Sequence, residues 1–125
     1  MGHAASRFTV LLVEDETLIS QLVSDWLSER GFAVHATATG DEALQYIGDG
    51  GEVHVLFTDV NLPGGMDGAE LAQRARQMLP DLPIVYASRH YGPRDINPAV
   101  PRSVFVPKPY DPAAVCTLLE WLTAA

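Results

Sequence analysis

Val53-His54-Val55-Leu56-Phe57-Thr58-Asp59-Val60-Asn61-Leu62-Pro63 is an apolar run that stops on a carboxylate and then turns at Pro63-Gly64-Gly65. Its length and β-branched content predict a strand that is buried on both faces. Asp59 stands at the carboxyl end of that strand. In open parallel sheets covered by helices, ligands and chemistry gather at this edge. We therefore expect the rest of the chain to bring partners to Asp59.

A second apolar run, at 8–13, also ends on acidic residues, Glu14-Asp15-Glu16, and predicts another buried strand. Shorter β-rich runs predict strands at 32–36, 83–87 and 103–107. Apolar residues at helical spacing predict helices that begin after Glu16, Thr39, Asp67 and Asp111, with capping boxes at 39–42 and 67–70. In the first helix, one apolar stripe is expected to pack on the sheet: Leu18, Ile19, Leu22, Val23, Trp26 and Leu27.

The alternation of strands and helices predicts the fold class. It requires a parallel sheet with right-handed crossovers, and the flavodoxin-like order 2-1-3-4-5 is the common solution at this size. We therefore predict an α/β protein with three layers, α/β/α, around a five-stranded parallel sheet of that order. Glycine and proline at 92, 93, 98 and 101 interrupt the fourth helix, which is expected to be short or irregular. In this order Glu14, Asp15 and Asp59 lie side by side at the switch point.

Size and charge limit the classes of function. The chain has 125 residues, is 47% hydrophobic and carries a formal net charge of -8, which predicts one globular domain with a single core. We expect that domain at 7–125, after a flexible end or cloning remnant at 1–6. The negative charge disfavours direct contact with nucleic acid or an anionic membrane. Without a membrane-length apolar stretch or a secretory signal, the chain is expected to be cytoplasmic.

Three carboxylates in one crevice repel one another, so we expect a cation to compensate them. Oxygen ligands in an incomplete cage favour Mg²⁺, because such a cage leaves positions for water and a phosphate. Asp15 and Asp59 are the expected direct ligands. Glu14 could act through water, and the turn at Asn61 could supply a backbone carbonyl.

Two further strand ends are expected at the same edge, Ser88 after the fourth strand and Lys108 after the fifth. A hydroxyl and an ammonium group that face acid and metal suit a small, highly charged oxyanion such as a phosphoryl group. An aspartate can attack phosphorus and form an acyl phosphate, while the lysine neutralises the developing charge. Asp59, Ser88 and Lys108 are therefore the candidate catalytic residues.

Four motifs stand in order at the predicted strand ends: Leu-Val-Glu-Asp-Glu at 12–16, Thr-Asp-Val-Asn-Leu-Pro at 58–63, Tyr-Ala-Ser at 86–88 and Phe-Val-Pro-Lys-Pro at 105–109. Together they resemble the receiver domain of two-component response regulators, which also occurs in hybrid histidine kinases. The resemblance runs from Val10 to the last helix. It implies that Asp59 accepts a phosphoryl group from a histidine kinase or phosphotransfer protein and controls a downstream protein or fused domain. It also implies a Mg²⁺ ion held by Glu14, Asp15, Asp59 and the Asn61 carbonyl.

The resemblance further implies a conformational switch, in which Ser88 moves to bind the phosphoryl group and Phe105 turns inward. From the residues alone, Phe105 could equally be a core aromatic. By analogy, the Lys108-Pro109 bond is expected to be cis. Two features depart from the family. Arg89 stands where a small residue is usual and could shield the phosphoryl group, and the irregular fourth helix alters a face that many receivers use for dimerisation or output.

Three functions follow from these observations. The first is a phosphoacceptor switch, which is no enzyme in the usual sense because it catalyses only its own phosphorylation and dephosphorylation. The alternative is a pseudo-receiver that binds proteins without being phosphorylated, which Arg89 slightly favours. A Mg²⁺-dependent phosphatase would want a second acid two residues after the nucleophile, where this chain has Asn61. Flavin binding is disfavoured because the acidic loop after the first strand would repel a cofactor phosphate.

Overall fold

Five strands and four helices alternate in the part of the chain that the structure, a computed structural model, describes, namely residues 8–88 and 100–124. In chain order they are β1 (Thr9–Val13), α1 (Thr17–Glu29), β2 (Ala33–Thr37), α2 (Gly40–Gly48), β3 (Val55–Asp59), α3 (Gly68–Met78), β4 (Ile84–Ser88), β5 (Ser103–Pro107) and α4 (Pro112–Thr123). The predicted strands are all present: β5 has the predicted bounds, and the bounds of the other four differ by one or two residues.

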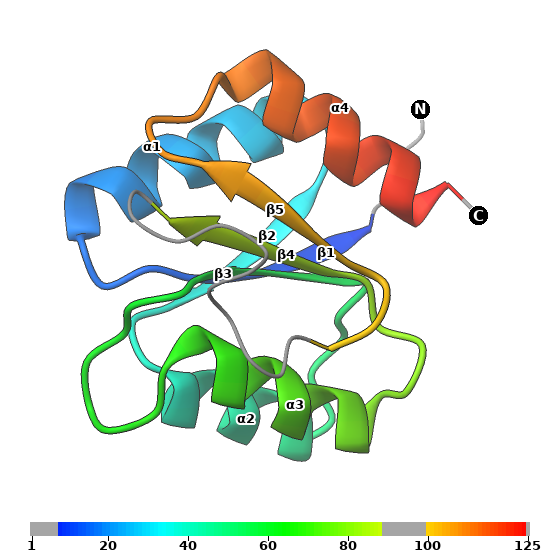
Figure 1. Cartoon of the computed structure of the whole chain (residues 1–125). Helices are drawn as coiled ribbons and strands as arrows, with labels where there is room; N and C mark the ends of the chain where they lie inside the picture. Colours follow the sequence, from blue (N-terminus) through cyan, green and yellow to red (C-terminus); the bar gives the residue numbers. More distant parts are fainter. Residues whose placement is uncertain (1–7, 89–99, 125) are drawn as a thin grey trace.

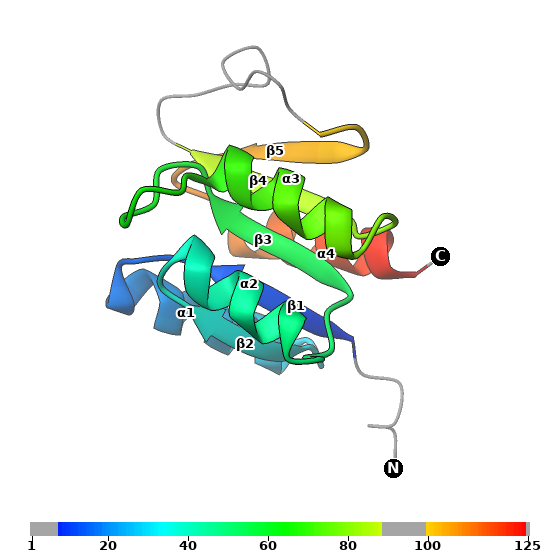
Figure 2. The same cartoon turned by 90° about the horizontal axis from the view of Figure 1, so that it is seen from below.

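The strands form one parallel sheet in the order β2-β1-β3-β4-β5, as predicted. Figure 1 shows α1 and α4 on one face of this sheet and α2 and α3 on the other, which gives three layers; Figure 2 shows the same arrangement from below. The flavodoxin-like α/β prediction is therefore confirmed. This order places β3 at the centre, so its carboxyl end lies between those of β1 and β4.

The core lies on both faces of the sheet, because successive side chains of a strand point to opposite faces. Leu56 of β3 packs into the cluster beneath α2 and α3, and its neighbour Phe57 packs into the cluster beneath α1 and α4. Both side chains are at most 1% exposed. Burying a side chain of this size contributes roughly 1.5–3 kcal/mol, so β3 is firmly held on both faces.

Side-chain caps fix the starts of two helices close to the site. The Thr39 hydroxyl accepts a hydrogen bond from the backbone N–H of Glu42 at 3.1 Å, which confirms the predicted cap of α2. The Glu42 carboxylate reaches back to the N–H of Ala38 at 2.8 Å, one residue earlier than in the usual capping box. At the start of α3, Asp67 accepts from the N–H of Glu70 at 2.9 Å.

The prediction of one buried stripe along α1 is wrong for two of its residues. Val23 and Leu27 are fully buried, whereas Leu18 is 75% exposed and Leu22 is 53% exposed. Six apolar residues within ten positions span more of a helix surface than one sheet contact can cover. The side of α1 that bears Leu18 and Leu22 therefore faces solvent.

Some expectations lie outside the described residues. These are the flexible end at 1–6, the irregular helix between β4 and β5, and the possible shielding role of Arg89. Across 8–88 and 100–124, every helix is too short or too polar to cross a lipid bilayer.

Candidate functional site

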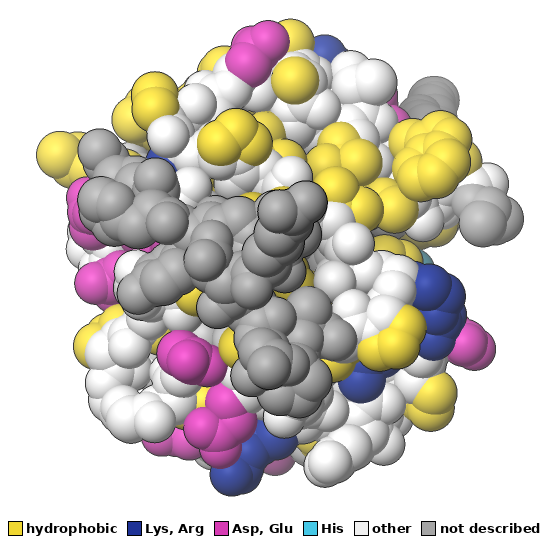
Figure 3. Space-filling view, in the orientation of Figure 1, with side chains coloured by type: hydrophobic (Ala, Val, Ile, Leu, Met, Phe, Trp, Pro, Cys, Tyr) yellow, Lys and Arg dark blue, Asp and Glu magenta, His cyan; other side chains and the backbone are white. Residues whose placement is uncertain are grey.

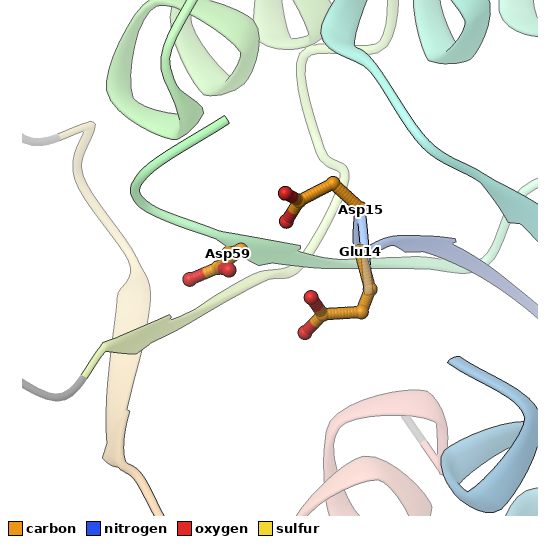
Figure 4. Close-up of side chains that lie close together, drawn as sticks. All are labelled: Glu14, Asp15 and Asp59. Atoms are coloured by element: carbon orange, nitrogen blue, oxygen red, sulfur yellow. The ribbon is translucent and has the colours of Figure 1, made fainter. Parts of the chain in front are cut away.

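Three acidic side chains meet where β1 and β3 end. Val13 is the register partner of Thr58, so the residues that follow them, Glu14 and Asp59, lie side by side at the carboxyl edge of the sheet. Carboxylate oxygens of Glu14, Asp15 and Asp59 all lie within 4.8 Å of one another, and Figure 4 shows the three side chains converging. The strand order thus brings together the residues that the sequence places at separate strand ends.

The loop after Asp59 is held by backbone hydrogen bonds at both ends. The N–H of Val60 donates to the carbonyl of Ala87 at 3.1 Å, and the N–H of Gly68 donates to the carbonyl of Val60 at 2.7 Å. Between them the chain turns through Gly64 and Gly65, whose φ angles of +89° and +90° are unfavourable for other residues. The turn predicted at these glycines is therefore present, and it returns the chain to the base of the site.

Gly68 is a positioning residue that the sequence reasoning missed. A Cβ atom at this position would overlap the carbonyl oxygen of Asp59 and lie 2.9 Å from the Cα atom of Val60. Both are backbone atoms of the strand end that carries the central carboxylate, so they cannot move aside cheaply. The sequence does contain an indication of this role, because Gly68 is a glycine at the second position of the capping box at 67–70.

Gly68→Ala is expected to destabilise the protein by about 1–3 kcal/mol, the usual cost of overpacking, and to displace Asp59. Chemical denaturation measures the first effect. Gly48→Ala at the end of α2 is the control, because its Cβ would make an ordinary contact of 3.6 Å with Met78. Equal stability of the two variants would contradict this prediction, because it would show that the backbone at Asp59 and Val60 can shift to make room for a Cβ atom without loss of stability.

Lys108 neutralises much of the acidic cluster. Its Nζ lies 3.0 Å from Oδ2 of Asp59 and 3.2 Å from Oε1 of Glu14. The side chains of Lys108, Glu14 and Asp59 are 7%, 2% and 12% exposed, so these ion pairs are shielded from solvent. Charge-assisted hydrogen bonds of this kind are stronger than neutral ones. Lys108 is also the only lysine in the sequence, a signal that sequence reasoning did not use.

The end of β5 places Lys108. Its backbone N–H donates to the carbonyl of Ser88 at 2.9 Å, which ties the ends of β4 and β5 together. The peptide bond between Lys108 and Pro109 is cis, as the family resemblance implied. From the end of β5, the ammonium group reaches across the sheet edge to Asp59 of β3 and to Glu14, which follows β1.

Electrostatics leave the site with uncompensated negative charge. Burial raises the pKa of the Glu14 carboxyl above its ordinary value, against the N–H of Glu16 and the ammonium of Lys108, which lower it. Burial likewise raises the pKa of the Asp59 carboxyl, although the hydrogen bond and the positive charge of Lys108 lower it. For Lys108, burial lowers the pKa, but the contacts with Asp59 and Glu14 outweigh it and the net shift is upward. A second cation would therefore be favoured here.

The other expected site residues lie at or near the same edge. Ser88 is 4% exposed at the end of β4, directly after Ala87, the register partner of Asp59. Phe105 is half-buried, and its ring centroid lies 5.6 Å from that of Tyr86. Asn61 is exposed in the loop after β3. Their roles in phosphoryl binding, switching and metal binding stay predictions.

Tyr110 is a second residue that sequence reasoning missed. Its ring centroid lies 5.5 Å from that of Phe57 and 6.2 Å from that of Trp26. Burial raises the pKa of Tyr110 to about 12, while Lys108 lowers it and Glu14 and other nearby acids raise it further. The phenol therefore stays neutral in the physiological range, and the ring packs against the core cluster on the α1 and α4 side of the sheet. The position of Tyr110 only two residues after Lys108 could have indicated that it lies near the site.

The donor set fits Mg²⁺. All three side-chain donors are carboxylates, the hard oxygen ligands that this ion prefers, and Asp15 is exposed while Glu14 is buried. Such a cluster is open on one side, as a site must be if water and a phosphoryl oxygen are to complete the coordination. Glu14, Asp15 and Asp59 are therefore the residues that would hold the ion.

Mg²⁺ is expected to stabilise the fold, by about 2.7 kcal/mol at one hundred times its dissociation constant. Asp15→Asn should weaken Mg²⁺ affinity by roughly tenfold, about 1.4 kcal/mol. Thermal unfolding across a Mg²⁺ titration measures both effects. Glu16→Gln removes an exposed acid from the same loop and should leave the titration unchanged. If Asp15→Asn titrates like the unaltered protein, the ion binds elsewhere.

The fold and the site together define a class of protein, a doubly wound parallel sheet with an acidic, lysine-bearing site at its switch point. Residues 10–120 match the family model described as response regulator receiver domain. The chain belongs to this family.

Relatives of known name agree with this assignment. The sensor kinase CckA of Brucella abortus (strain 2308) is 35% identical over 115 residues, which cover 90% of this chain and 12% of the kinase. The response regulator receiver protein Anae109_2439 of Anaeromyxobacter sp. (strain Fw109-5) is 32% identical over 112 residues, or 88% of this chain and 43% of that protein. The chain thus spans less than half the length of either relative.

The fold is shared with solved receivers. The crystal structure of a response regulator receiver protein from Sinorhizobium medicae WSM419 has a TM-score of 0.89 and 30% identity, and the match covers 96% of this chain and 97% of that chain. This chain is thus similar to a receiver over almost its full length.

Proposed function

We propose that this receiver domain, at 7–125, accepts a phosphoryl group on Asp59 and acts as a signalling switch. The observation that carries the proposal is the buried Lys108 ammonium, which binds Asp59 and Glu14 at the edge where Asp15 also lies. A pseudo-receiver that binds partners without phosphorylation is the alternative. It gives no reason to keep three acids and a buried lysine together.

In the proposed reaction, a carboxylate oxygen of Asp59 attacks phosphorus and forms an O–P bond. The bond from phosphorus to the donor breaks, and the electron pair leaves with the imidazole of a phosphohistidine or the carboxylate of a small acyl phosphate. Lys108 stabilises the charge on the phosphoryl oxygens, and Ser88 donates a hydrogen bond to one of them. Water later hydrolyses the acyl phosphate, so the protein catalyses only its own phosphorylation and dephosphorylation.

A bound Mg²⁺ would supply further charge neutralisation of the phosphoryl group. Glu14, Asp15 and Asp59 would hold it, together with the backbone carbonyl of Asn61. Since Lys108 contacts two of these carboxylates, the ion and the ammonium group together would balance the acids and the incoming phosphoryl group.

The switch is proposed to run from Ser88 to Phe105. Movement of Ser88 toward a phosphoryl group would pull on β4, where Tyr86 contacts the Phe105 ring. A new hydrogen-bonded charge at one end would thus bias the position of a half-buried aromatic at the other. A downstream protein or a fused domain would read this difference, in the cytoplasm, where the phosphodonor kinases act.

A histidine kinase or phosphotransfer protein is the proposed donor, and it is proposed to dock on Leu18 and Leu22. These two side chains are 75% and 53% exposed and lie on α1, which begins directly after the acidic loop. Exposed apolar side chains beside a reaction site suit a protein partner.

Leu18→Ala with Leu22→Ala is expected to slow phosphotransfer from a cognate kinase roughly tenfold or more, as for an interface residue worth over 1 kcal/mol. Phosphorylation by acetyl phosphate should be unaffected, because this donor needs no docking surface. Radiolabel transfer measures both rates. An equal loss with both donors would mean that the substitutions damage the site instead.

Intact mass spectrometry tests the proposed function. Incubation with acetyl phosphate and Mg²⁺ should add one phosphoryl group to the protein, and chelation of Mg²⁺ should prevent it. A protein that keeps its fold, binds Mg²⁺ and gains no mass would support the pseudo-receiver instead. Repeated turnover of a phosphomonoester would favour a phosphatase.

A further inference from the structure

The loop that joins β3 to α3 is anchored by one buried side chain, Met66. The loop is closed at its base by the hydrogen bond from the N–H of Gly68 to the carbonyl of Val60 at 2.7 Å. Within residues 61–67, Leu62 is half-buried and Met66 is 7% exposed, while the other five residues are exposed. Figure 3 shows acidic and basic side chains over α3, whereas Met66 packs into the core cluster beneath α2 and α3. Met66 is therefore the side chain that holds this loop most firmly against the core.

Met66 lies against Gly40, the first residue of α2. A Cβ atom at position 40 would lie 2.8 Å from the sulfur of Met66 and 3.3 Å from its Cγ, closer than such atoms pack. The backbone gives no other reason for a glycine here, because the φ angle of Gly40 lies outside the left-handed region and glycine is a poor helix former. Glycine at position 40 therefore makes room for the Met66 side chain.

The same junction holds the acidic loop after β1. The N–H of Glu14 donates to the carbonyl of Thr37 at 3.0 Å, and Thr37 ends β2 shortly before Gly40 begins α2. Through Gly40, Met66 thus connects the loop that carries Asn61 with the segment that binds the backbone of Glu14. Both segments lead to the edge of the sheet where the three carboxylates meet.

We propose that Met66 is a positioning residue for the Mg²⁺ site. The inference rests on the proposed function, in which the backbone carbonyl of Asn61 is a ligand of the ion. By filling the space beside Gly40, Met66 holds the β3–α3 loop in one place, so the carbonyl does not have to be ordered when the ion binds, and this preorganisation favours binding. The loop cannot supply that order by itself, because it contains Gly64 and Gly65, and glycine loses the most conformational freedom on ordering.

Calorimetric titration with Mg²⁺, at a temperature where every variant is folded, tests this role. Met66→Ala is expected to weaken Mg²⁺ affinity roughly tenfold, as is usual for a residue that orients metal ligands without touching the metal. Gly40→Ala should weaken it as well, because the new methyl group displaces the Met66 side chain. Adding Gly40→Ala to Met66→Ala should cost little more, because no side chain remains to be displaced, and such non-additivity marks residues in contact. Met66→Leu, which nearly conserves the side-chain volume, should retain most of the affinity.

The other end of α2 supplies a matched control. There Gly48 faces Met78, but a Cβ atom at position 48 would make an ordinary contact of 3.6 Å with it. Gly48→Ala and Met78→Ala should therefore leave Mg²⁺ affinity unchanged. A Met66→Ala variant that loses stability in urea but binds Mg²⁺ like the unaltered protein would overturn this inference alone, because Met66 would then only support the fold. An unaltered protein that binds no Mg²⁺ would overturn the proposed metal site as well.

Discussion

Asp59→Asn is expected to reduce phosphoryl incorporation to background while the fold persists. An amide is a poor nucleophile toward phosphorus, so position 59 can no longer accept the phosphoryl group. Intact mass after treatment with acetyl phosphate and Mg²⁺ measures the loss. The matched control is Asp111→Asn, because asparagine caps a helix as well as aspartate does and this position is only the cap of α4. That variant should incorporate phosphoryl normally.

The same Asp59→Asn variant is expected to unfold at a higher denaturant concentration than the unaltered protein at neutral pH. Burial raises the pKa of Asp59, so the folded state holds its ionised form at a cost. A neutral isostere removes that cost, while Lys108 keeps Glu14 as its partner. A stability that is lower than that of the unaltered protein would show that the Asp59–Lys108 pair is net stabilising. The expected gain in stability would mean that the ionised carboxylate of Asp59 is kept for function at the expense of stability.

Lys108→Met is expected to destabilise the fold by about 3 kcal/mol at neutral pH. Removal of one partner leaves two buried carboxylates uncompensated, which typically costs 3–5 kcal/mol, and the lower end applies because Asp59 still reaches solvent. This is a large part of the 5–15 kcal/mol of an ordinary domain. Arg74→Met breaks the exposed pair between Arg74 and Glu70 and is the control, with an expected change within about 1 kcal/mol.

The cost of Lys108→Met should shrink as the pH falls. The folded pKa values of Glu14 and Asp59 are raised above 4.5 and 3.8, the ordinary values, so the folded state takes up protons first and is stabilised on acidification. Loss of Lys108 raises both pKa values further, so the variant gains more than the unaltered protein as the pH drops from neutral toward those values. Urea denaturation across this range measures the difference. A pH-independent loss would mean that packing, not charge, is responsible.

The fold could be predicted from the sequence because the apolar pattern of each strand agrees with the place that the strand takes in the sheet. The run that ends on Asp59 is buried on both faces, as its unbroken apolar pattern predicted, and that pattern fixes β3 at the centre of the sheet. The parallel order then determines which strand ends are neighbours. The sequence alone could therefore predict that Glu14 and Asp59 lie close together, because they stand at the ends of β1 and β3, which are neighbours in the sheet.

Other features depend on tertiary contacts that a pattern does not encode. Leu18 and Leu22 share the helical spacing of Val23 and Leu27, and only the placement of α1 on the sheet decides which pair is exposed. The approach of Gly68 to the Asp59 carbonyl arises where a loop closes. The contact of Lys108 with two carboxylates depends on how far its side chain reaches across the sheet edge.

Reductive mapping of the phosphorylated residue tests the central claim most directly. Borohydride converts an aspartyl phosphate to homoserine, and peptide mass spectrometry locates the change. After treatment with acetyl phosphate and Mg²⁺, we expect homoserine at position 59 and at no other acid. Homoserine at position 15, or a phosphoryl group that remains on a hydroxyl or imidazole, would contradict the proposal that the acids at this sheet edge serve to phosphorylate Asp59.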